Sequence, residues 1–154
     1  KDHEPYWDMI GGTFWAHPWN ADATVTIKVH DPSHPACAAL GESFNIQDEI
    51  YIFKNWQPDK VRVLMSLDME QTNPEAPIHV PVSWVKTYGE GKIFYTSLGH
   101  REETWSDERF LGSIAGAVRW ILGEAEGVAT PNPEISAAER EIAKRVGARN
   151  KGRP

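Results

Sequence analysis

Between residues 24 and 98 the chain carries several β-prone segments and leaves almost no room for helices between them. Residues 24–30 alternate apolar and polar side chains, which is typical of a strand with one solvated face. The other segments of β-prone character are 44–53, 61–67, 80–88 and 92–98. Parallel neighbouring strands need helical crossovers, so this order excludes a complete doubly wound sheet. We expect either that part of such a fold is missing or that the sheet is largely antiparallel.

Glycine and proline residues mark the connections between these segments. Gly89 and Gly91 predict a hairpin turn between the last two of them. Two prolines predict a turn over residues 31–35, and the polar residues 68–77 are expected to form a long loop. Residues 1–23 are expected to form an irregular or partly helical lead-in.

Two helices are expected after the strands. Ser106 is predicted to cap a helix over about residues 107–122. The core-facing side of that helix is expected to carry the apolar residues that share one face, namely Phe110, Leu111, Ile114, Val118, Ile121 and Leu122. Ser136 and Glu139 form a capping-box pattern, which predicts a short second helix to about Val146.

Composition narrows the class of protein. The 154 residues suggest one domain, and a net charge of −6 argues against a nucleic-acid partner. The locally basic residues 145–154 lack interleaved aromatic side chains, so a solvated terminus is expected there. No apolar run approaches the length of about 20 residues that spans a membrane. The single cysteine, Cys37, excludes an internal disulfide and leaves the redox compartment open.

The first residues carry neither an initiator methionine nor the pattern of a signal peptide. This predicts a chain that begins inside a longer protein or after processing. Without a targeting signal, both a cytoplasmic and a periplasmic location stay open.

The segment 91–100 holds the first candidate for a functional group. A β-prone run ends at Leu98 and is followed by Gly99 and His100. In open α/β sheets ligands bind outside the carboxyl ends of strands, and an imidazole there titrates near physiological pH. His100 is therefore a candidate site residue.

The adjacent acids Asp48 and Glu49 are the second candidate. Neighbouring residues of an extended segment point to opposite sides, so at most one of them faces a given cleft. Glu49 shares its side with Tyr51 and Phe53. A half-buried strand requires one acid to be paired or functional, whereas the alternative is a solvated carboxylate at an edge.

Other chemistry-bearing residues favour structural interpretations. Taken by itself, His17 is interpreted as a turn histidine held by local hydrogen bonds. His30 and His34 have the spacing of a helical metal pair, but the prolines around them exclude that helix. No motif of a serine nucleophile or of nucleotide binding is present.

Seven tryptophans stand out in the composition. Most are expected to pack in the core, because buried aromatic side chains are usually structural. The exception is the early cluster of Trp7, Trp15 and Trp19 near His17, which is expected to include ligand contacts.

Taken together, six ordered pieces of the chain resemble the ThuA-like domain, a family named for trehalose utilisation and related in fold to class I glutamine amidotransferases. The pieces are residues 9–14 with His17-Pro18, residues 31–35, residues 48–51, residues 81–84, residues 88–100, and Trp105 with the helical residues 117–120.

The resemblance implies an α/β, flavodoxin-like sandwich of the class I glutamine amidotransferase type. The family's opening parallel half has no counterpart here, so residues 1–123 resemble its carboxyl-terminal portion and leave a mixed or antiparallel sheet. Residues 124–154 would add a proline-containing linker, a short helix and a basic tail. The amidotransferase nucleophile would lie in the absent half, where the family lacks the cysteine, so no glutaminase activity is expected.

The resemblance also implies a bacterial protein of carbohydrate metabolism that handles trehalose or related disaccharides, including 3-keto derivatives. Proton abstraction next to a keto group would need a base and an electrophile. Our hypothesis gives His100 the acid or base role and makes Glu49 its partner or a metal ligand. A divalent ion held by His17, Glu49 and His100 would fit, although nothing in the spacing requires a metal.

Four further side chains are expected to contact the sugar, namely His17, Tyr51, Trp19 and Arg101. A non-catalytic sugar-binding or interaction module of a larger protein is the alternative. A third hypothesis is a fragment whose function depends on the absent half or on a second copy of the chain. The sequence leaves the reaction, the sugar and the oligomeric state open.

Overall fold

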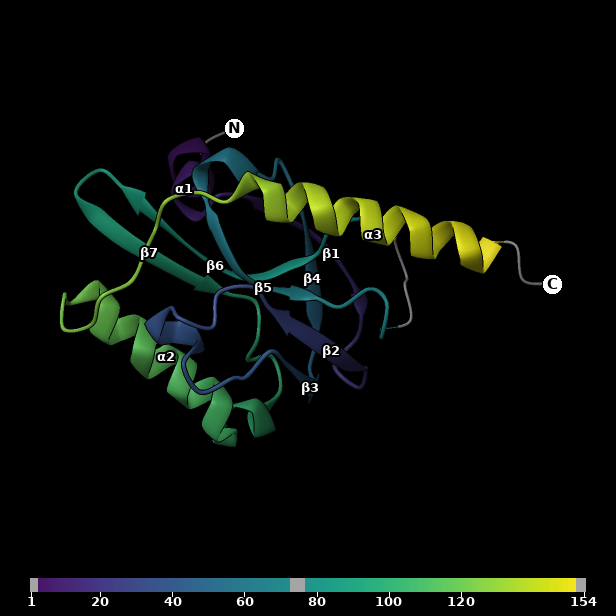
Figure 1. Cartoon of the computed structure of the whole chain (residues 1–154), viewed down its shortest axis with the longest axis horizontal. Coiled ribbons are helices and arrows are strands. Elements are labelled where there is room, and N and C mark those ends of the chain that lie inside the picture. Colours follow the sequence, from purple (N-terminus) through teal and green to yellow (C-terminus); the bar gives the residue numbers. More distant parts are fainter. Residues whose placement is uncertain (1–2, 73–76, 152–154) are drawn as a thin grey trace.

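The computed structural model describes residues 3–72 and 77–151 (Figure 1). Its helices are α1 (Glu4–Ile10), α2 (Glu108–Ile121) and α3 (Pro133–Lys151), and short 3-10 turns lie at Pro35–Cys37, Pro58–Lys60 and Glu102–Ser106. Its strands are β1 (Thr13–Trp19), β2 (Thr24–Val29), β3 (Ser43–Gln47), β4 (Ile50–Lys54), β5 (Arg62–Leu67), β6 (Pro81–Tyr88) and β7 (Gly91–Thr96). None of the helices in these residues is long and apolar enough to cross a membrane.

The strands form two sheets in which all neighbours are antiparallel. Five of them follow the order β3-β2-β5-β6-β7, and β1 pairs with β4 in a separate two-stranded ribbon. The helices α2 and α3 cover opposite faces of the five-stranded sheet (Figure 1). The expectation of a largely antiparallel sheet is confirmed, as is the hairpin of β6 and β7. The expectation that this chain lacks the opening, parallel half of the family's sheet stays a prediction.

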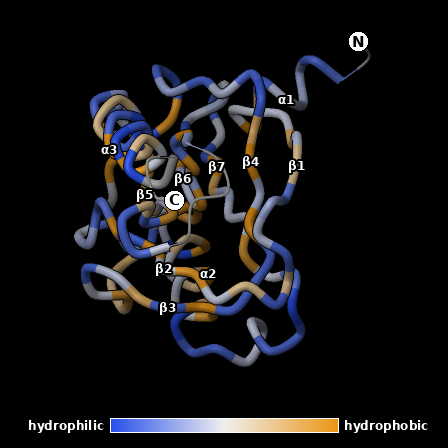
Figure 2. Tube along the Cα trace, turned by 90° about the vertical axis from the view of Figure 1, so that its right-hand side faces the viewer, coloured by the Kyte–Doolittle hydropathy of each residue, from blue (hydrophilic) through white to orange (hydrophobic). Residues whose placement is uncertain are grey.

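Aromatic packing joins the ribbon to the larger sheet. The Phe53 ring of β4 meets the rings of Trp84 on β6 and Tyr95 on β7 edge to face, with centroids 5.2 and 5.7 Å away. Trp84 is fully buried, and its indole N–H donates to the carbonyl oxygen of Ile10 at 2.7 Å. Hydrophobic stretches (orange in Figure 2) follow β4 and the sheet, whereas much of α3 is hydrophilic.

The segment predicted as one strand over residues 44–53 is divided between the two sheets. β3 belongs to the five-stranded sheet and β4 to the ribbon, with Asp48 and Glu49 at the junction. The lead-in was also only partly predicted, because it contains the strand β1 after α1. The pairing of β1 with β4 has two register shifts, which break the simple alternation that identifies a strand.

The helix α2 differs from its prediction in both cap and orientation. Asp107, not Ser106, is the N-cap, and its carboxylate accepts a hydrogen bond from the N–H of Arg109 at 2.8 Å. The buried face consists of Phe110, Ser113, Ala117 and Trp120. The predicted core residues Leu111, Val118, Ile121 and Leu122 are instead exposed, by 44, 47, 40 and 65%.

A close backbone contact accounts for the orientation of α2. A Cβ atom on Gly116 would lie 2.1 Å from the carbonyl oxygen of Pro35, so this turn of helix touches the Pro35–Cys37 segment directly. On the same side the Trp120 ring packs edge to face with the His34 ring at 5.1 Å. These contacts decide which apolar residues are buried.

The helix α3 begins earlier and ends later than predicted. Pro133 opens it, because the fixed φ of proline suits a first helical residue. The side chain of the preceding Asn132 holds it to β5 by hydrogen bonds with the N–H and the carbonyl of Val63, at 2.7 and 3.0 Å. Ser136 is consequently buried inside the helix rather than capping it.

A polar layer lies between α3 and the sheet. The Lys28 ammonium donates to the Glu139 carboxylate at 3.0 Å, and Ser66 Oγ lies 2.8 Å from His79 Nε2. Burial lowers the pKa of His79 to about 3, and the charge of Arg140, together with that of His30 once it is protonated in acid, lowers this pKa further. Burial and Lys28 lower the pKa of His30 to about 4. Both imidazoles are therefore neutral at physiological pH.

Because of these two histidines, we expect the free energy of unfolding to fall in mild acid. Their folded pKa values lie below the unfolded value of 6.5, so the unfolded chain binds protons first as the pH falls. Stability is fully present above pH 6.5 and is lost towards pH 4. By pH 4.5 we expect each histidine to lower the free energy of unfolding by about 2–3 kcal/mol. Urea unfolding at several pH values measures this, and His79→Gln should flatten the dependence whereas the exposed His3→Asn should not.

Two glycines of α2 provide a matched test of its packing. Gly116→Ala places a methyl group against the Pro35 carbonyl and should lower the free energy of unfolding by about 1–3 kcal/mol or more. In Gly112→Ala the new methyl would lie 3.7 Å from the Ala39 side chain, an ordinary contact. That variant should be stabilised by up to about 1 kcal/mol, because alanine favours the helix. Equal effects in urea unfolding would contradict this orientation of α2.

Candidate functional site

Glu49 lies between two histidines at the junction of β3 and β4. One of its carboxylate oxygens, Oε2, is 3.4 Å from His17 Nδ1, and the other, Oε1, is 3.6 Å from His100 Nδ1. The Glu49 side chain is 13% exposed, whereas the two imidazoles are 54% and 47% exposed. The structure thus brings together three of the residues predicted from the sequence. We call this group the Glu49 site.

Strand pairing and a loop bring the histidines to this point. In the ribbon, Ala16 pairs with Ile52 and Trp19 with Ile50, so His17 on β1 lies beside the start of β4. His100 follows β7, the strand that ends at Thr96. The site therefore draws on both sheets.

The buried carboxylate of Asp48 holds the loop that carries His100. The side chain is completely buried. It accepts hydrogen bonds at 2.7–3.1 Å from the N–H groups of Glu49, Gly99 and Arg101 and from the Thr104 hydroxyl. The two adjacent acids point to opposite sides, as extended residues do. The anchoring role of Asp48 was not predicted, because its partners are about 50 residues away in the sequence.

Aromatic side chains form the wall of an open depression beside Glu49. The depression has a volume of about 580 Å³ and is lined by Phe14, His17, Glu49, Tyr51 and Tyr95. The Phe14 ring stacks on the His17 imidazole with centroids 6.2 Å apart and meets Tyr51 edge to face at 5.1 Å. Phe14 and Tyr95 were not among the predicted site residues, since each lies in a run of residues that equally suits packing.

Both tyrosines of this wall keep their phenolic protons at neutral pH. Burial and the charge of Glu49 raise the pKa of Tyr51. Burial raises the pKa of Tyr95 to about 12. Both phenols are therefore hydrogen-bond donors, and the Tyr51 O–H is already directed to the Glu49 carboxylate, which also raises its pKa.

Two of the predicted ligand contacts lie elsewhere. Trp19 is only 4% exposed and packs in the main core. The Arg101 guanidinium pairs with Asp22 and Glu103, each at 3.0 Å, and lines a separate depression. Tyr51, by contrast, lines the depression beside Glu49.

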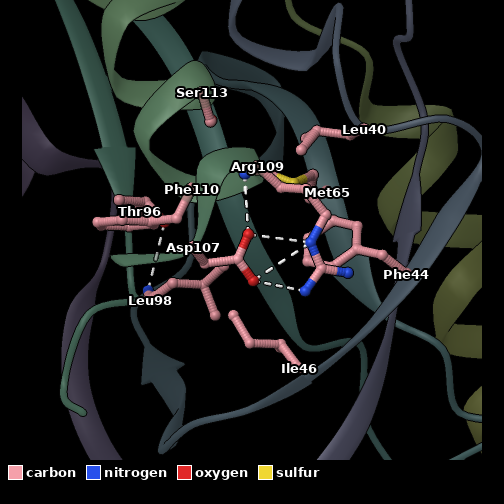
Figure 3. A pocket seen from close by; sticks show the side chains of 10 residues that line it. All are labelled: Leu40, Phe44, Ile46, Met65, Thr96, Leu98, Asp107, Arg109, Phe110 and Ser113. Atoms are coloured by element: carbon pink, nitrogen blue, oxygen red, sulfur yellow. Dashed lines mark hydrogen bonds and ion pairs between the residues drawn. The ribbon is translucent and has the colours of Figure 1, made fainter. Parts of the chain in front are cut away.

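A second hollow, beneath the start of α2, is apolar (Figure 3). It is narrow, with free space for about one water molecule, and is lined mainly by aliphatic and aromatic side chains such as Phe44, Met65 and Phe110. Its charged groups, Asp107 and Arg109, pair with each other, and this pairing lowers the pKa of Asp107. The hollow therefore offers no free acid or base.

The two oxygens of Glu49 face different imidazoles, so the three side chains do not converge on one point. Within residues 3–72 and 77–151, no group of three or more His, Cys, Asp or Glu side chains is arranged to hold a metal ion. The expected ion at His17, Glu49 and His100 stays a prediction, and we derive no step through a metal.

The chain is similar in structure to solved ThuA-like proteins. A solved ThuA-like protein from Bacteroides uniformis matches with a TM-score of 0.62 and 23% identity, over 85% of this chain and 55% of that chain. A ThuA-like protein from Parabacteroides merdae matches with a TM-score of 0.47 and 18% identity, over 80% of this chain and 49% of that chain. The chain thus spans about half the length of the solved structures that it matches. Among curated proteins no relative matches it.

The first of these structures shares the fold. The model of the ThuA family, described as trehalose utilisation, matches residues 1–121. That match covers both sheets, the Glu49 site and all of α2. The chain therefore belongs to the ThuA family of trehalose utilisation.

Proposed function

We propose that the Glu49 site binds trehalose or a related disaccharide and moves protons on it, with 3-keto derivatives as the substrates that best suit its chemistry. The observation that carries the proposal is a carboxylate held between two half-exposed imidazoles beside an aromatic wall. The family's link to trehalose utilisation supplies the class of sugar.

The Glu49 carboxylate is in position to fix the tautomer of both histidines, that is, which ring nitrogen carries the proton. Each imidazole presents its Nδ1 to a Glu49 oxygen, which favours the proton on that nitrogen. The Nε2 atom of a neutral imidazole is then free to accept a proton. The separations of 3.4 and 3.6 Å exceed a hydrogen bond, and such contacts commonly tighten when substrate binds.

A keto-sugar needs two groups. The depression offers one of them, Tyr51, and His100 beside the other oxygen of Glu49 is the second. The C–H next to the carbonyl loses its proton to a base, for which His100 is our choice. Negative charge then develops on the carbonyl oxygen and must be stabilised by a donor. The Tyr51 phenol, protonated at neutral pH, supplies that donor when its O–H turns from the Glu49 carboxylate to the substrate.

The aromatic wall fits a sugar ring as well. Phe14, Tyr51 and Tyr95 present apolar ring surface, and the two phenols add polar ends. Such surfaces cover the apolar side of a pyranose while leaving its hydroxyl groups to polar partners. His17, which stacks on Phe14, is a polar partner beside this wall.

A non-catalytic sugar-binding module is the second candidate. Two tryptophans, Trp15 and Trp105, are exposed by 62% and 57%, which is unusual for so large an apolar side chain. Exposed indoles of this kind are common in surfaces that bind ligands without reacting with them.

Turnover distinguishes the two candidates. We expect the chain to convert 3-keto-trehalose, followed by NMR with and without added divalent metal, and His100→Ala to lower kcat at least about a hundredfold. Glu49→Gln should lower kcat to a similar extent, because the amide no longer fixes the tautomer of the two imidazoles. Trp15→Ala is the control and should leave kcat unchanged.

Unchanged turnover in His100→Ala would exclude the acid–base role. Absence of turnover together with broadening of sugar resonances, abolished by Trp15→Ala, would establish the binding module instead.

Asp48→Asn tests the placement of His100. The amide replaces one acceptor oxygen by a donor facing N–H groups, so we expect the free energy of unfolding to fall by about 1–3 kcal/mol. The imidazole resonances of His100 should also move towards those of a free histidine. Asp22→Asn, which alters an exposed partner of the same loop, is the matched control. An unmoved His100 spectrum in Asp48→Asn would contradict the anchoring role.

A further inference from the structure

An apolar stripe runs along the outer surface of α2. Leu111, Val118 and Leu122 are exposed by 44, 47 and 65%, and Ala115 between them is exposed as well. The four residues recur at the three- and four-residue spacing of one helical face. We call this set the outer stripe.

The outer stripe is exposed in the part of the chain that the structure describes. The buried residues of α2, such as Phe110 and Ala117, face the sheet on the opposite side of the helix. The helix α2 lies at the outside of the molecule (Figure 1), and among the described residues the side chains of the outer stripe are exposed. Repeated apolar residues on an exposed helical face commonly mark a contact with another helix.

Opposite charges stand at the two ends of the outer stripe. Glu108 lies in the first turn of α2 and Arg119 in the last, and both are exposed. Eleven positions separate them, so they are about 16 Å apart along the helix, too far for an ion pair within one chain. In the described part of the chain neither side chain forms an ion pair.

We propose that a second copy of the chain docks on the outer stripe, with the two α2 helices antiparallel about a two-fold axis. The axis places Glu108 of each copy opposite the partner's Arg119, so that both ion pairs form at once. The apolar residues then lie against each other between these pairs. Antiparallel helices also oppose their dipoles favourably.

Charge complementarity favours this occupant over a membrane surface. A helix that lies on lipid carries several lysines or arginines along its polar flanks. The outer surface of α2 has a glutamate at one end and an arginine at the other, and the chain has a net charge of −6. Since a single helix pair buries less than a standard interface, the dimer should be weak and concentration-dependent.

Charge reversal across the axis tests the arrangement. Sedimentation of the 154-residue chain between about 5 and about 500 µM should show a monomer–dimer equilibrium. Glu108→Arg and Arg119→Glu should each weaken it about tenfold, because each puts like charges opposite one another twice. The double variant should return to within about threefold of the original Kd, since both pairs are restored in reverse.

Two further variants separate the outer stripe from other surfaces. Val118→Glu should abolish the dimer, whereas Val128→Glu, at another exposed apolar residue beyond α2, should leave it intact. Circular dichroism checks that each variant folds. A monomer at every concentration, a dimer insensitive to Val118→Glu, or failure of the double variant to recover would each overturn the proposal.

Discussion

The burial of the Asp48 carboxylate is the constraint on which the rest of the site depends. Removing a carboxylate from water costs free energy unless hydrogen bonds from the protein satisfy its oxygens. Asp48 meets this requirement by drawing in the N–H groups of Gly99 and Arg101 and the hydroxyl of Thr104. The loop after β7 is therefore folded onto the β3–β4 junction, and His100 has no freedom to lie far from Glu49.

Much of the fold could be read from local pattern. The alternation in residues 24–30 and the glycines around residue 90 predicted β2 and the β6–β7 hairpin, because strand periodicity and turn chemistry act over a few residues. The candidates Glu49 and His100 were likewise singled out from residue type and position, whereas His17 and Tyr51 were expected to contact a ligand only through the family resemblance. Their grouping around Glu49 follows from the pairing of β1 with β4, which no local pattern contains.

What could not be predicted was decided by contacts distant in sequence. α2 has apolar residues on more than one side, and the approach of Gly116 to Pro35 selects which side is buried. The sequence neighbours of Trp19 suggest an aromatic side chain that binds a ligand. Trp19 is the last residue of β1, however, and there its side chain packs in the core. In both cases tertiary packing overrides a pattern that fits two outcomes.

The division of roles between Asp48 and Glu49 constrains the order and spacing of these two residues in the sequence. One acid serves the fold and its neighbour serves the depression, because consecutive side chains of an extended chain face opposite ways. Exchanging their order would keep the composition but leave a longer acid in a closed interior and a shorter one in the open. Inserting one codon between them would turn every following side chain of β4 to the other face. The two acids therefore serve their separate roles only in this order and at this spacing.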